Sequence, residues 1–121
     1  MSKLSGKEMA VAIAQAMDDK KADDVQILRM SEMMVETDYF VICSCVSFPQ
    51  MQAITQSVRE RMDQHGVPLC RQEGRDNNHW ILLDYGEAVA HIFLESERRY
   101  YNLEKLWADA ERVPFKEGAE A

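Results

Sequence analysis

The clearest hydrophobic pattern in the chain lies between residues 79 and 94, where two apolar segments flank a short polar break. The first segment spans residues 81–83 and the second spans residues 89–94. The break between them reads Asp84-Tyr85-Gly86-Glu87, and Gly86 can adopt the positive φ that a tight reversal needs. The pattern predicts a β-hairpin at the centre of a sheet rather than a ribbon on the surface.

Side chains alternate between the two faces of a strand, so the first strand of this hairpin presents two different sets. One set is Trp80, Leu82 and Asp84, and the other is Ile81, Leu83 and Tyr85. If helices cover only part of the sheet, one set is left exposed to a partner. Tryptophan is common both in cores and at the centres of interfaces, so both interpretations of Trp80 stay open.

Two amphipathic helices are predicted on either side of the first strands. Ser5 and Glu8 form a capping box ahead of an apolar stripe that begins at Met9. Ser47 and Gln50 repeat this signal, with Pro49 tolerated in the first turn, and His65-Gly66 ends the second helix. The stripes expected to be buried are Met9, Ile13 and Met17 in the first helix and Met51, Ile54, Val58 and Met62 in the second.

The remaining elements follow from shorter patterns. Strands are predicted at 24–30, at 39–46, which is apolar on both faces and therefore central, and at 67–71. The order strand, helix, strand from 39 to 71 predicts a right-handed parallel crossover. We also predict a connector at 31–37, a polar loop at 72–78 and one or two short helices at 96–101 and 102–107.

Together these elements predict one α/β (α+β) domain over residues 1–107, built as a mixed five-stranded sheet with flanking helices. A chain of 121 residues can bury a sizeable core without metal or disulfide support. After residue 107 apolar residues become sparse and Pro114 and Gly118 interrupt the chain, so we expect residues 108–121 to form a frayed tail.

Net charge narrows the choice of partner. Fourteen basic against twenty-one acidic residues give −7, and no basic face is evident, which argues against direct DNA binding through phosphates. An acidic surface suits a basic protein partner. Neither a membrane-spanning run nor a secretory signal is expected, and three cysteines without framework spacing indicate reduced thiols in the cytoplasm.

The residues that could carry chemistry form incomplete sets. Cys43 and Cys45 share a strand face, but a zinc site needs four ligands, so no metal is expected. Ser44 or Ser47 with His91 suggests a nucleophile and a base, yet no GxSxG elbow and no orienting aspartate accompany them. His91 is better explained as a half-buried histidine in an apolar strand.

Several of these segments carry a resemblance to a known family. The quoted segments are DDKKADDVQIL at 18–28, TDYFVICSCVS at 37–47, HWILLDYGEAVAHIF at 79–93 and YYNLEKLW at 100–107. Their order and spacing resemble those of the ribosomal silencing factor family, also called RsfS or Iojap, from about Glu8 to Trp107. The likeness covers almost the whole chain, and we expect the chain to share the family's fold and function.

The resemblance implies a protein that binds the large ribosomal subunit through ribosomal protein fourteen and sterically blocks joining of the small subunit. Translation would then fall when nutrients are scarce, without catalysis or a cofactor; relatives in organelles are linked to ribosome assembly. Carried over by position, the contact region is the hairpin. Its residues would be Trp80, Leu82, Asp84 and Tyr85, together with Glu73 and His91.

The family's fold is related to that of nucleotidyltransferases, so a nucleotide-binding or nucleotidyl-transfer enzyme is the alternative function. That chemistry needs carboxylates converging on metal ions, whereas residues 67–71 contain none and Asp84 stands alone. A third possible function is self-association through an exposed hairpin. A homodimer that forms off the ribosome is compatible with ribosome silencing as the main function.

The chain also departs from the family's usual pattern. Cys45 replaces a usual glycine, Phe48-Pro49 replaces polar or basic residues, and Gly86-Glu87 replaces Gly-Asp. These departures leave the segment from Trp80 to Tyr85 intact but put contacts at the start of the second helix in doubt.

Overall fold

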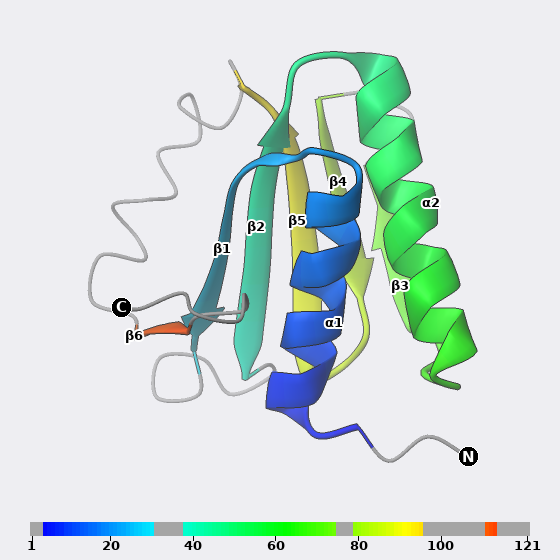
Figure 1. Cartoon of the computed structure of the whole chain (residues 1–121). Coiled ribbons are helices and arrows are strands. Elements are labelled where there is room, and N and C mark those ends of the chain that lie inside the picture. Colours follow the sequence, from blue (N-terminus) through cyan, green and yellow to red (C-terminus); the bar gives the residue numbers. More distant parts are fainter. Residues whose placement is uncertain (1–3, 31–37, 75–78, 96–110, 114–121) are drawn as a thin grey trace.

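A computed structural model describes residues 4–30, 38–74, 79–95 and 111–113, which form two helices and six strands (Figure 1). In chain order the elements are α1 (Gly6–Asp19), β1 (Asp23–Arg29), β2 (Tyr39–Cys45), α2 (Phe48–Gln64), β3 (Arg71–Glu73), β4 (Trp80–Asp84), β5 (Ala88–Leu94) and β6 (Glu111–Val113). The predictions for residues 31–37, 75–78 and 96–107, and for most of the tail, lie outside the described residues.

The strands form one mixed sheet in the order β3-β4-β5-β2-β1-β6. β2 and β5 run parallel, and every other neighbouring pair is antiparallel. The predicted mixed sheet of five strands is therefore confirmed. The sixth strand, β6, pairs with β1 inside the segment expected to be a frayed tail, and three residues followed by Pro114 give too short a pattern to predict it.

β2 has the central place that its composition predicts. It lies between β1 and β5, and all of its residues after Tyr39 are buried. A strand that is covered on both faces cannot alternate between apolar and polar residues, so it reads as a continuous apolar run. The two core clusters of the protein lie on the two sides of this strand.

The predicted crossover to a strand at 67–71 is only partly right. The segment after α2 pairs as a strand only at Arg71–Glu73, and β3 is separated from β2 by β4 and β5. Val67 still belongs to the helix end, because its N–H donates to the Met62 carbonyl at 3.0 Å, and Pro68 has no N–H to give a ladder. The parallel neighbour of β2 is β5 instead.

Both helices begin where the capping signals predict. At α1 the Glu8 N–H donates to Ser5 Oγ, and the Ser5 N–H donates to Glu8 Oε1, which completes the capping box. At α2 the Gln50 N–H donates to Ser47 Oγ at 3.2 Å, but the Gln50 side chain accepts from the Val46 N–H. Its amide nitrogen instead donates to the carbonyls of Lys20 and Lys21, which links the start of α2 to the end of α1.

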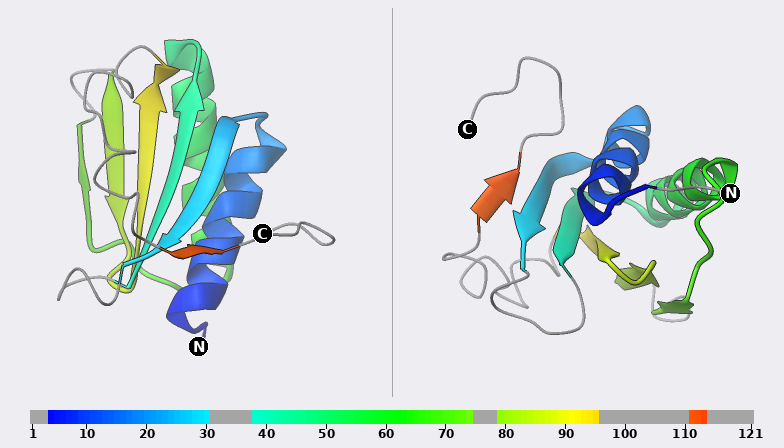
Figure 2. Two further views of the ribbon diagram at one scale, coloured as in Figure 1. Left: turned by 90° about the vertical axis from the view of Figure 1, so that its left-hand side faces the viewer. Right: turned by 90° about the horizontal axis from the view of Figure 1, so that it is seen from below.

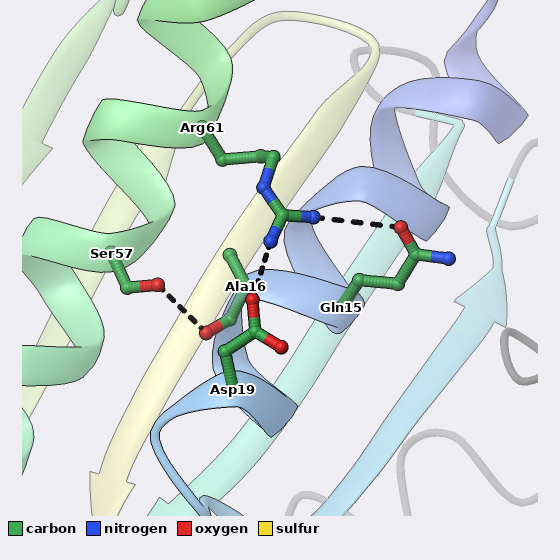
Figure 3. Close-up of polar contacts among 5 residues, drawn as sticks. All are labelled: Gln15, Ala16, Asp19, Ser57 and Arg61. Atoms are coloured by element: carbon green, nitrogen blue, oxygen red, sulfur yellow. Dashed lines mark hydrogen bonds and ion pairs between the residues drawn. The ribbon is translucent and has the colours of Figure 1, made fainter.

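The two helices lie side by side on one face of the sheet, with α1 over β1 and β2 and α2 toward β5 (Figures 1 and 2). Ser57 Oγ donates to the Ala16 carbonyl at 2.9 Å, and the Arg61 guanidinium contacts Gln15 and Asp19 (Figure 3). Of the two predicted apolar stripes, Met9 is only partly buried and packs against the larger core cluster, and all the other residues are buried. No helix in the described part of the chain is long and apolar enough to cross a membrane.

Candidate protein-docking face

The hairpin of β4 and β5 places its two sets of side chains as the alternation predicts. Ile81, Leu83 and Tyr85 point to the face that carries the helices and join the larger core cluster. Trp80 and Leu82 point to the opposite face, where the register sets them beside Phe93 and His91. We call the opposite face at β3, β4 and β5 the hairpin face, defined by Glu73, Trp80, Leu82, Asp84 and His91.

His91 is at the centre of the hairpin face. Its ring centroid lies 4.6 Å from that of Phe40 on β2 and 6.1 Å from those of Trp80 and Phe93. Burial lowers the pKa of His91 to about 4, so the imidazole is uncharged at neutral pH. Trp80 Nε1 donates to His91 Nδ1 at 3.2 Å, which makes His91 a buried residue that holds the indole in place. The interpretation of His91 as a histidine within an apolar strand is confirmed by this burial.

Trp80 combines both of the roles that the sequence left open. Its ring stacks against Phe93 and His91 and packs on the smaller core cluster, yet it is only partly buried. The indole N–H is directed inward to His91, so the part of the ring that reaches the surface is apolar. A rigid, partly exposed aromatic ring of this kind is what protein interfaces use as an anchor.

Charged side chains lie on the same face as Trp80, farther along the sheet edge. The register pairs Arg71 with Asp84 and Glu73 with Leu82, so these residues share the hairpin face. Arg71 Nη1 lies 2.8 Å from Glu73 Oε2, and Arg71 Nε lies 3.5 Å from Asp84 Oδ2. Asp84 also accepts from the Gly86 N–H at 2.8 Å, so it stabilises the hairpin turn as well. An apolar ring beside exposed charges gives the composition of a protein interface with a polar rim.

Tyr85 does not belong to this group. It lies on the helix side of the sheet, only 5 % exposed, and burial raises its pKa to about 12. The structure therefore brings together five of the six residues named from the sequence and separates Tyr85 from them. The reason is the two-residue period of a strand, which puts Tyr85 with Ile81 rather than with Asp84.

Arg71 and Phe93 are members of the hairpin face that the sequence reading did not name. Arg71 was predicted at the end of a strand over residues 67–71, and no local pattern indicates that it pairs with Asp84 of β4. Phe93 could have been found from the alternation of β5, in which it shares a face with His91. Gly74, with φ of +86°, brings its backbone against Trp80: an added Cβ would lie 2.0 Å from the Trp80 carbonyl oxygen.

The turn between β2 and α2 is occupied by structural contacts. Ser47 Oγ caps α2, and Cys45 is buried, with its pKa raised to about 11 by desolvation. Across the described residues no group of three or more His, Cys, Asp or Glu side chains could hold a metal ion. These side chains hold the fold together at this turn.

Comparison with known proteins supports the fold and gives the family. The family model "Ribosomal silencing factor during starvation" matches residues 3–121. The chain is 41% identical to the ribosomal silencing factor RsfS of Bacillus subtilis, over 88% of this chain and 91% of that protein. A crystal structure of a Chromobacterium violaceum protein aligns with a TM-score of 0.83 at 28% identity, covering 87% of this chain and 88% of that one.

A mouse protein also aligns, at 32% identity over 73% of this chain and 40% of its own length. It is named mitochondrial assembly of ribosomal large subunit protein 1. The fold and the hairpin face define a small α+β protein with the surface features of a protein-binding domain. The chain belongs to the ribosomal silencing factor family, whose members are regulatory proteins that associate with ribosomes and silence translation.

Proposed function

We propose that this chain binds the large ribosomal subunit in the cytoplasm through ribosomal protein fourteen and thereby sterically blocks joining of the small subunit. The observation that carries the proposal is the hairpin face, where a partly exposed Trp80 held by His91 is bordered by Glu73, Asp84 and Arg71. This surface needs no cofactor and performs no chemistry, because occupying the joining surface is enough to keep the subunits apart.

Charge supports the same partner. The chain carries −7, whereas a ribosomal protein that binds RNA is basic, so attraction would speed the encounter. Glu73, whose side chain is 44% exposed, offers a carboxylate at the border of the apolar surface. The name of the mouse relative refers to the large subunit, which is the subunit proposed here.

The proposal is tested by sedimentation with isolated large subunits, comparing two charge reversals. Glu73→Lys and Glu60→Lys each remove one negative and add one positive charge, so both take the net charge from −7 to −5. Glu73 lies on the hairpin face, whereas Glu60 lies on α2. We expect Glu73→Lys to weaken binding about tenfold, or ~1.4 kcal/mol, and Glu60→Lys to leave it near that of the parent.

Trp80→Ala should abolish most of the binding as well, and thermal melts show whether that variant remains folded. Failure of the parent to sediment with large subunits would overturn the proposal. So would equal binding by the parent and Glu73→Lys. Light scattering over a concentration series would reveal a homodimer that uses the same face off the ribosome.

A further inference from the structure

The helix layer of the fold leaves one end of the sheet open. Within the described residues, α1 and α2 make their main contacts with each other and with β1, β2 and β5. Figure 2 shows β4 and β3 continuing the sheet past β5 to its far edge. On the helix side of these two strands lies a cleft of about 700 Å³, which we call the α2–β3 cleft.

The α2–β3 cleft has an apolar floor and two different walls. Ile81 and Tyr85 of β4 form the floor, α2 forms one wall, and residues 67–69 with Gln72 form the other. Arg59 Nη1 donates to Gln72 Oε1 at 3.2 Å and so bridges the walls. These side chains point to the helix side of the sheet, whereas those of the hairpin face point from β3, β4 and β5 to the other side.

The shape of the cleft indicates what it can hold. α2 lines it from Phe48 to Asp63, a length of about 22 Å at ~1.5 Å per residue. A cleft of this length has room for one row of side chains on its apolar floor, and the helix that carries them would lie above it, alongside α2.

Exposed apolar residues mark one end of this path. Among the described residues the exposed large hydrophobic side chains are Val46, 68% exposed, and Phe48, 43% exposed. Phe48 lines the cleft where α2 begins, and its ring lies against His79, with 6.5 Å between centroids. Phe48 therefore offers an anchoring contact for the end of a helix laid along the cleft.

The charged residues that line the cleft favour a basic occupant. Glu60 and Asp63 place carboxylates along the α2 wall, against the single cation of Arg59, and the chain as a whole carries −7. We propose that the α2–β3 cleft is a docking site for an amphipathic helix of a partner protein, with an apolar row that enters the cleft and basic residues on its flanks. Since the hairpin face points the other way, both surfaces can be occupied at once.

The test uses two synthetic peptides of ~16 residues, enough to follow α2 along the cleft. Both carry the same leucine stripe, with lysines on the flanks of one and glutamates on the flanks of the other. Calorimetry should give binding of the lysine peptide at least tenfold tighter than that of the glutamate peptide. Amide chemical-shift changes should be confined to α2, residues 67–72 and β4.

Variants separate this site from the hairpin face. Glu60→Lys should weaken the lysine peptide about tenfold, and Gln56→Trp, which fills the cleft from an exposed helical position, should block it. Glu73→Lys has the same net charge as Glu60→Lys and should bind the peptide like the parent. In sedimentation with large subunits the order should be reversed: Glu73→Lys should bind more weakly than the parent, and Glu60→Lys should bind like the parent. Failure of one proposal is therefore distinguishable from failure of the other.

Several results would overturn the proposal. Equal binding of the two peptides, or shift changes on the hairpin face, would remove the cleft as a basic-helix site. Shift changes in the cleft that depend on protein concentration would mean that a second copy occupies it. A cleft that opens only when residues 114–121 are deleted would mean that the chain's own tail fills it.

Discussion

His91 shows how a single residue acquires a role from its surroundings. The sequence around His91 allowed two roles for its imidazole, that of a catalytic base or that of a half-buried histidine in an apolar strand. The structure surrounds the ring with Phe40, Trp80 and Phe93 and gives it the indole N–H as a hydrogen-bond donor. A neutral, buried imidazole that accepts this bond positions Trp80, and the partner contact proposed for the hairpin face would depend on that position.

The lowered pKa of His91 predicts a pH-dependent stability. The folded pKa, about 4, lies below the ordinary value of 6.5, so folding favours the neutral ring. The neutral ring contributes about 3 kcal/mol to the free energy of unfolding. This contribution is present in full above pH 6.5 and is lost as the pH falls toward 4. Urea unfolding of the parent and His91→Gln should show the parent's advantage shrinking through this window.

Glutamine is the useful replacement because its side-chain oxygen can still accept from Trp80 Nε1. Carboxylates titrate in the same range in both proteins, so the difference between them isolates the histidine. His79→Gln, at an exposed histidine before β4, should retain the pH dependence of the parent. A difference between parent and His91→Gln that stays constant from pH 6.5 to pH 4 would contradict the burial of a neutral His91.

At the scale of elements, the hairpin was predictable because its information is local. Alternation, an apolar run and the Asp84–Glu87 break specified both strands and the turn, in which Gly86 has φ of +91°. The same alternation already placed Tyr85 and Trp80 on opposite faces of the strand. The family resemblance, in contrast, assigned both residues to one contact region. The face of a residue is decided by strand parity, so the structural placement of Tyr85 follows from the sequence once the strand is known.

Gly74 could not be selected from the sequence, because its importance lies in contact with another strand. Gly74 and Gly86 both have positive φ, so alanine is strained at either position. Only at Gly74 does an added Cβ also strike backbone, since nothing lies within 4 Å of it at Gly86. Gly86→Ala should cost about 1–2 kcal/mol, and Gly74→Ala should cost clearly more.

Chemical unfolding of the two glycine variants provides the measurement, and the tryptophan fluorescence of Gly74→Ala should also change because Trp80 must move. Equal destabilisation by both substitutions would mean that the backbone at Trp80 can shift at little cost in free energy. In that case Gly74→Ala should bind large subunits like the parent. If Trp80 is displaced instead, binding of Gly74→Ala to large subunits should be weaker.

Across the whole molecule, the sequence predicted the kinds of elements better than their neighbours. The composition of β2 placed it correctly at the centre. The strand-helix-strand rule predicted a parallel crossover after β2, and β3 does run in the direction of β2, but it lies at the edge of the sheet with β4 and β5 between them. Strands that are far apart in the sequence pair according to which arrangement buries the core best. The local pattern of apolar and polar residues does not indicate which of the possible pairings that is.

The two proposed surfaces also belong to this scale, because they arise from how the helices cover the sheet. In the described part of the chain both helices lie on one side of the sheet, Trp80, Asp84 and Glu73 keep exposed area on the other side, and the α2–β3 cleft lies beyond the helices. The acidic charge favours basic partners at both proposed surfaces. Because the two proposed surfaces lie on opposite sides of the sheet, the account predicts that a partner on one does not overlap a partner on the other.

The central claim is that occupying the large subunit prevents the small subunit from joining it. The most direct measurement mixes purified small and large subunits with the protein and follows formation of joined ribosomes by light scattering. The parent and Glu60→Lys should lower the joined fraction as they saturate the large subunit, and Glu73→Lys should require about tenfold more protein. Undiminished joining while the parent is bound to the large subunit would contradict steric silencing.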